Sequence, residues 1–109
     1  MNYTQNSKIA QVTERTLVIG VDIGSETNYA RAFNWRGQEL SKKVFRFSNS
    51  QEGFQSFSDY LRNNQVIASA EQIIVGCEPT GHYWFTLAKY LKTQHINLAL
   101  VNPYHVKQI

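Results

Sequence analysis

The stretch LVIGVDIG, residues 17–24, decides the fold because it joins a continuous apolar run to a single acidic residue. A run rich in β-branched residues, without polar alternation, is typical of a central strand that is covered on both faces. We therefore expect a buried strand over residues 17–23. Asp22 lies near the end of this strand, where a carboxylate is costly unless it meets a cation or hydrogen-bond donors. The sequence must therefore supply a partner for Asp22.

The composition fits one α/β domain. The chain has 109 residues, of which 42% are hydrophobic and 13% aromatic, which allows one core but is too short for two domains. No apolar run approaches the roughly 20 residues that cross a membrane, and the polar start has no signal-peptide pattern. The single cysteine, Cys77, cannot form an internal disulfide. We therefore expect a protein of the reducing cytoplasm, with no membrane partner.

The charge balance permits a polyanionic partner without requiring one. The net charge is +3 and the pI is about 9.1. The basic residues are scattered, apart from Lys42, Lys43 and Arg46 in a strand-like segment. A solvated face is the simpler interpretation of these three residues, and a track that binds phosphates is the alternative.

The hydrophobic pattern predicts the element order β-β-β-α-β-α-β. Residues 1–15 lack periodicity and are expected to be a flexible lead-in to a domain over residues 16–109. Asn49, with Glu52 three residues later, has the pattern of a helix N-cap, and Thr80 is the expected cap of the second helix. A glycine turn at 35–38 should join two strands into a hairpin. The expected strands are 17–23, 27–34, 39–47, 72–78 and 96–101. The chain stops after the last strand, so we expect part of a longer protein, truncated before a final helix.

Two of these strands end in an acid that follows a glycine by two positions, in GVD at 20–22 and GCE at 76–78. If the strands are parallel neighbours joined by a right-handed crossover, Asp22 and Glu78 lie about 5 Å apart at the carboxyl edge of the sheet. Two carboxylates this close repel each other, and Mg²⁺, which prefers hard oxygen ligands, removes the repulsion. The alternative is structural, with Asp22 bonded to amides of the following loop and Glu78 solvated. The matched positions favour a metal site that serves phosphoryl transfer.

Three nearby residues are weaker candidates for nucleic-acid contacts. Thr80 and His82 lie at an expected helix start, where free amides suit phosphate. The hydroxyl of Ser25 could orient Asp22 or a phosphate. Capping, ring packing and local turn bonds are the structural alternatives for these residues.

Two other residues near the acids are expected to be structural. Trp84 falls on the apolar face of the second helix and should belong to the core. Cys77 should point away from Glu78 and be a buried, unreactive thiol, because no basic residue lies nearby in the sequence.

The blocks VIGVDIGSETNYARAF (18–33), EPTGHYW (78–84) and VNP (101–103) together resemble the DEDD transposases of bacterial insertion sequences of family 110, which are grouped with the Piv-type DNA invertases. The likeness spans residues 16–109. Its specific part is EPTGHYW followed by VNP, whereas DIG alone is weak. The resemblance implies a ribonuclease-H-like mixed sheet, related to that of the Holliday-junction resolvase RuvC.

The resemblance also implies a site and an activity. The family has four acids, Asp-Glu-Asp-Asp, that bind Mg²⁺ (or Mn²⁺), and Asp22 and Glu78 match the first two. The other two acids, and a serine on a further domain, lie later in such proteins. The implied function is that of a DNA transposase or site-specific recombinase, which cleaves and transfers DNA strands. The implied partners are DNA, a structured guide RNA and further copies of the protein. With half of the acids, this chain should be inactive alone.

Two other functions stay open. Sugar-kinase and Hsp70-like ATP-binding lobes also open with a strand that ends in D-x-G-[ST], followed by a hairpin, and GVDIGS fits that opening. Against this, residues 48–101 are compact, and EPTGHYW is not expected there. A non-catalytic nucleic-acid-binding module of the same fold is the second alternative.

Overall fold

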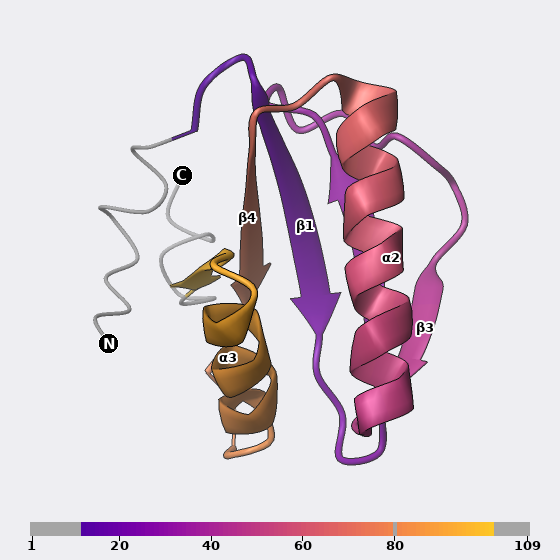
Figure 1. The fold of residues 1–109 in the computed structure, drawn as a ribbon, viewed down its shortest axis with the longest axis vertical. Coiled ribbons are helices and arrows are strands. Elements are labelled where there is room, and N and C mark those ends of the chain that lie inside the picture. The colour runs from indigo at the N-terminus through magenta and orange to yellow at the C-terminus, as the bar shows by residue number, and fades with distance from the viewer. Residues whose placement is uncertain (1–11, 80, 102–109) are drawn as a thin grey trace.

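A computed structural model describes residues 12–79 and 81–101, which form a five-stranded mixed sheet and two helices (Figure 1). The strands lie in the order β3-β2-β1-β4-β5. Strands β2 and β1, and β3 and β2, pair antiparallel, whereas β4 and β5 run parallel to β1. The elements are β1 (Thr16–Asp22), β2 (Thr27–Phe33), β3 (Phe45–Ser48), α2 (Gln51–Ala68), β4 (Gln72–Cys77), α3 (Trp84–Thr93) and β5 (Asn97–Leu100). This order confirms the predicted ribonuclease-H-like sheet.

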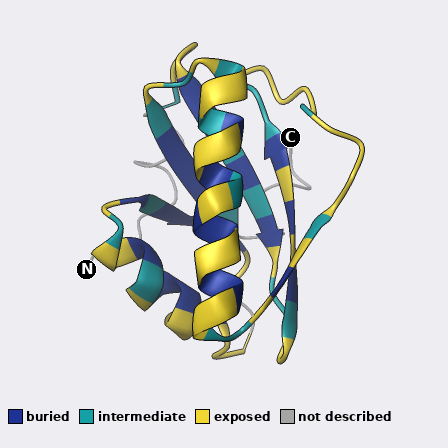
Figure 2. Ribbon diagram, turned by 45° about the vertical axis from the view of Figure 1, so that its right-hand side comes forward, coloured by how far each residue is buried: buried dark blue, intermediate teal, exposed yellow. Residues whose placement is uncertain are grey.

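Both helices pack on one face of the sheet. Alternate residues of β1, Leu17, Ile19 and Val21, point into a core that also holds the apolar faces of α2 and α3. The two helices also meet each other, since the rings of Phe54 and Tyr90 stack with centroids 5.2 Å apart. In Figure 2 the buried residues of α2 turn toward the sheet and the exposed ones turn away from it. Most of the buried hydrophobic side chains therefore lie on one side of the sheet, between the strands and the two helices.

The prediction that β1 is covered on both faces is wrong for the described part of the chain. The residues between the core positions, Val18 and Gly20, are only partly buried, and Asp22 is exposed. We call this side of the sheet, opposite α2 and α3, the open face. A continuous apolar run fits a central strand here because β1 lies between β2 and β4, even though the described helices cover only one of its faces.

The predicted hairpin is confirmed, but its second strand is shorter than expected. Two backbone hydrogen bonds close the turn. The amide of Asn34 donates to the carbonyl of Gln38, and the amide of Leu40 donates to the carbonyl of Ala32. After a single bridge at Glu39, the chain leaves the sheet and rejoins it only at β3. Residues 41–44 are all exposed, because SKKV has no side chain that reaches the core. Contact with the core resumes in β3, where Phe45 stacks on Tyr60 and Phe47 on Phe57 of α2, with centroids 4.3 and 4.2 Å apart.

The helix boundaries also differ from the predictions. Ser50, not Asn49, caps α2, and its hydroxyl accepts a bond from the amide of Gly53. Helix α3 begins at Trp84 with Tyr83 in the N-cap position, not directly after Thr80. The expected flexible lead-in falls largely on residues 1–11, outside the described residues. No described helix is long and apolar enough to cross a bilayer.

Candidate functional site

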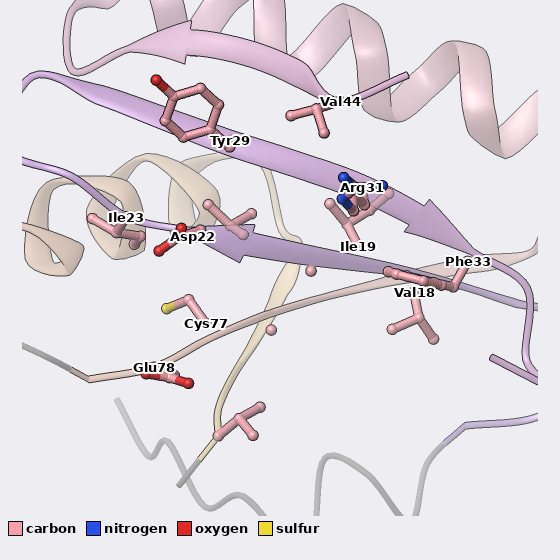
Figure 3. A pocket seen from close by; sticks show the side chains of 14 residues that line it. Val18, Ile19, Asp22, Ile23, Tyr29, Arg31, Phe33, Val44, Cys77 and Glu78 are labelled. Carbon is pink, nitrogen blue, oxygen red and sulfur yellow. The ribbon is translucent and has the colours of Figure 1, made fainter. Parts of the chain in front are cut away.

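The pairing of β1 with β4 brings the two strand-end acids together. Six successive pairs are in register, from Thr16 with Gln72 to Val21 with Cys77. The next residues along the two parallel strands are Asp22 and Glu78, and both are exposed. Neighbouring strands lie about 5 Å apart, so the two carboxylates leave the same edge of the sheet side by side. Figure 3 shows them on adjacent strands, facing the same hollow.

This hollow has a volume of about 980 Å³ and lies on the open face. Asp22 and Glu78 line one part of it, and Gly20 and Gly76, which pair with each other in register, line the floor beside them. A Cβ at Gly20 would meet only the Phe33 ring, at 3.6 Å, so the fold itself does not require glycine there. The two glycines thus keep the floor free of side chains next to the acids.

Neither carboxylate has a hydrogen bond or an ion pair with any residue in the ranges 12–79 and 81–101. The loop after β1 bonds to other groups: the amide of Gly24 donates to Oδ1 of Asn28, at 3.2 Å. Asn49 donates to the carbonyls of Gly24 and Ser25, at 2.9 and 3.0 Å. The structural alternative for Asp22, in which it bonds the amides of this loop, is therefore not what the described structure contains.

The donor set fits a hard divalent cation. Two exposed carboxylates that are side by side and unpaired offer oxygen ligands, and Mg²⁺ accepts one or two carboxylates while it keeps several waters. Within the described residues, no group of three or more His, Cys, Asp or Glu side chains could hold a metal. The described residues therefore bring together two candidate oxygen ligands, Asp22 and Glu78.

The two weaker candidates that the structure describes, Ser25 and His82, lie outside this hollow. Both residues are exposed. The ring of His82 lies 4.5 Å from that of Tyr83, just before α3. Thr80 lies outside the described residues. Trp84 is buried in the core, as predicted.

Cys77 is the buried, unreactive thiol that the alternation predicts. Its side chain belongs to the core. Burial, and to a lesser degree the nearby charge of Glu78, raises the pKa of the Cys77 thiol to about 12. Near neutral pH the sulfur is therefore protonated and is a poor nucleophile and a poor metal ligand.

Sequence reasoning missed two residues on the open face, Tyr29 and Arg31 of β2, and considered Arg46 of β3 only as part of a basic segment with Lys42 and Lys43. Tyr29 pairs with Asp22, and Arg31 with Gly20, so both point to the side of the sheet that carries the acids. Arg31 forms an ion pair with Glu39 across the hairpin. The signal was present, because alternation in TNYARAF places Tyr29 and Arg31 on one face, but only the register shows that this face also carries the acids.

Comparisons with known proteins agree with this architecture. A profile of the DEDD transposase family of insertion sequence 110 matches residues 19–109. No curated protein matches the chain. Among solved structures, a foamy viral protease-reverse transcriptase in complex with double-stranded DNA is similar, with a TM-score of 0.51 and 16% identity. That match covers 82% of this chain and 20% of the viral chain, so this chain spans about a fifth of the viral protein, and the likeness concerns the fold alone.

Proposed function

We propose, from the premise that this chain belongs to the DEDD transposase family of insertion sequence 110, that it forms the N-terminal part of the catalytic domain of a DNA transposase. The family implies transposase activity in the whole protein. The observation that supports a role for this part is the in-register pair of unpaired carboxylates, Asp22 and Glu78, at the carboxyl edge of the sheet. Family membership favours this function over an ATP-binding lobe.

In this proposal Asp22 and Glu78 hold Mg²⁺ or Mn²⁺ through carboxylate oxygens. When bound, the cation would neutralise charge on a DNA phosphate and activate the attacking oxygen. The chain's own contribution is to fix the two carboxylates at one strand spacing, because the β1–β4 ladder holds both strand ends. The glycine floor leaves room beside them for a substrate or for the remaining ligands.

DNA is the proposed substrate of the whole protein. The family name supports this, as does a similar fold in a protein that was solved with double-stranded DNA. The net charge of +3 is compatible with a polyanion. A structured guide RNA and assembly into homo-oligomers in the cytoplasm complete the proposal on the strength of the family resemblance.

Metal binding tests the proposal without any need for catalysis. Mn²⁺ added to the isotope-labelled chain should broaden amide NMR signals around residues 22 and 78 selectively. Asp22→Asn and Glu78→Gln should each weaken Mn²⁺ binding, measured by titration, by at least about tenfold. Glu71→Gln is the matched control, because Glu71 is an exposed acid at the opposite end of β4, paired with Arg15.

The non-catalytic alternative makes the opposite prediction. If Asp22→Asn and Glu78→Gln bind Mn²⁺ as the unaltered chain does, and leave transposition by the whole protein intact, the acids are not metal ligands and the proposed function fails.

A further inference from the structure

A row of four side chains crosses the open face at the level of the acids. In the sheet register Arg46 of β3 pairs with Tyr29 of β2, and Tyr29 pairs with Asp22 of β1. Glu78 follows on the β4 side, next to Asp22. Paired residues of adjacent strands point to the same face at about 5 Å spacing. Tyr29, Asp22 and Glu78 can be followed across their strands in Figure 3.

The two arginines on the open face, Arg46 and Arg31, differ in whether an acidic side chain neutralises them. Arg31 lies two residues beyond Tyr29 along β2, on the same face, and forms an ion pair with Glu39. Arg46 is exposed and forms no ion pair with any described residue. On the open face, Arg31 beside Gly20 is therefore neutralised by Glu39. Arg46, in line with the acids, has no ion-pair partner among the described residues.

The ring of Tyr29 lies on the open face and does not belong to the core. Its side chain is 43% exposed and lines the hollow directly beside Asp22. An exposed aromatic ring that flanks a phosphate-binding site can stack against a base or sugar, whichever base is present. A guanidinium presents a planar fork of donors that matches a phosphate.

From this row we propose that Arg46 and Tyr29 extend the acid pair into a binding site for one nucleic-acid strand. The inference rests on the proposed function, in which a DNA phosphate lies at Asp22 and Glu78. Arg46 binds the backbone phosphate of a neighbouring nucleotide, and the Tyr29 ring stacks on the base or sugar between the two phosphates. In this proposal the nucleic-acid strand runs over the open face from the acids, past Tyr29 on β2, to Arg46 on β3.

The chain offers a matched control at the opposite end of the hairpin. Trp35 and Arg36 are also an exposed aromatic ring and an arginine, with the guanidinium carbon 5.1 Å from the ring centroid. Trp35 is 43% exposed, the same fraction as Tyr29. These residues follow the end of β2, whereas Tyr29 lies near its start, so they are far from the acids along the strand.

The test is the affinity of the 109-residue chain for a fluorescent single-stranded oligodeoxynucleotide, measured by anisotropy at several salt concentrations. Tyr29→Ala should weaken binding by about tenfold, and Tyr29→Phe should restore it, since the ring and not the hydroxyl stacks. Arg46→Gln should weaken binding and lower the salt slope by roughly 0.7. Trp35→Ala and Arg36→Gln should change the affinity by less than about twofold, and thermal melts should show that every variant is folded.

Several outcomes would overturn the inference. Equal losses in Arg46→Gln and Arg36→Gln would mean that general charge, not this row, attracts the strand. Unchanged affinity in Tyr29→Ala would remove the stacking role. If Tyr29→Ala and Arg46→Gln alter only the oligomeric state in light scattering, the row is a contact between copies of the protein.

The test separates this inference from the proposed function. If the Arg46 and Tyr29 variants bind both Mn²⁺ and the oligonucleotide as the unaltered chain does, the strand-binding role is wrong. The proposed metal site is then unaffected. Loss of oligonucleotide affinity in these variants, with Mn²⁺ binding that does not depend on Asp22, would reject the metal site while a strand-binding surface remains.

Discussion

Gly24 and Gly20 stand two positions on either side of Asp22, yet they are glycines for different reasons. A Cβ on Gly24 would lie 2.5 Å from the carbonyl oxygen of Thr27, which is backbone and cannot move aside cheaply. A Cβ on Gly20 would have ordinary contacts. The glycine of the D-x-G motif is thus explained by the tight turn into β2, without a bound nucleotide.

Substitutions by alanine should separate these two roles. Gly24→Ala should lower the free energy of unfolding by about 1–3 kcal/mol, as expected for an overpacked site. Gly20→Ala should change it by no more than about 0.5 kcal/mol, although its methyl group narrows the floor beside the acids. Urea unfolding followed by circular dichroism measures both values. Equal destabilisation by the two substitutions would contradict this assignment.

The Cys77 thiol should make the stability of the chain depend on alkaline pH. Its pKa is about 12 in the folded state, against 9.0 for an unperturbed thiol. The unfolded chain therefore loses this proton first, and the stability that the buried thiol contributes is complete below pH 9 and lost as the pH rises toward 12. Urea unfolding of the chain between pH 8 and 11 should show a fall in stability that is smaller in Cys77→Ala. Identical pH profiles would show that Cys77 is not the cause.

Between elements, Asn49 is the residue that ties the α2 start to the loop after Asp22. Its Nδ2 donates to the carbonyls of Gly24 and Ser25, and its Oδ1 accepts a bond of 2.7 Å from Asn28, whose side chain is fully buried. The sequence pattern marked Asn49 as a helix cap, but its side chain serves this loop, and the neighbouring Ser50 caps the helix. Sequence spacing alone cannot separate two adjacent polar residues that both suit a cap.

Removal of the Asn49 amide should loosen the loop next to the acids. Asn49→Ala leaves the buried Asn28 amide without its acceptor, so we expect a loss of about 1–3 kcal/mol in the free energy of unfolding. Hydrogen exchange should also become faster at the amides of residues 24–28. Asn63→Ala is the matched control, because Asn63 is exposed on α2. If both variants exchange alike in this loop, Asn49 does not hold it.

The elements that the sequence predicted well are those with an inward apolar face. Strand β1 was predicted from its unbroken apolar run, and α2 from the hydrophobic pattern that follows the cap-like residues at its start. The predicted second strand of the hairpin, residues 39–47, was too long. Residues 41–44, SKKV, have the composition of a strand but no side chain that is buried. The acid pair was foreseen because position and glycine spacing matched on two strands. The alignment of Tyr29 and Arg46 with the acids was not foreseen, because it depends on antiparallel register, which residue types do not encode.

At the scale of the whole chain, a site with two acids should be incomplete. We expect the 109-residue chain to bind Mg²⁺ weakly and to leave supercoiled plasmid DNA uncut in Mg²⁺ or Mn²⁺, because two carboxylates supply few of the ligands that two metal ions need. A longer protein of this family, with all four acids, is the positive control. Robust metal-dependent cleavage by the chain, abolished by Asp22→Asn, would refute the expectation of inactivity.

The spacing of the two acids is set by a ladder and not by the segments that join the strands. Asp22 and Glu78 are 56 positions apart in the chain, yet six consecutive register pairs hold their strands together. The exposed stretch 41–44 lies outside every strand and reaches no core residue. A peptide tag or a small reporter inserted there should therefore leave the acids where they are. Related proteins could therefore lengthen residues 41–43 without altering the spacing of the acids, whereas Val44 lines the hollow and would have to stay in place.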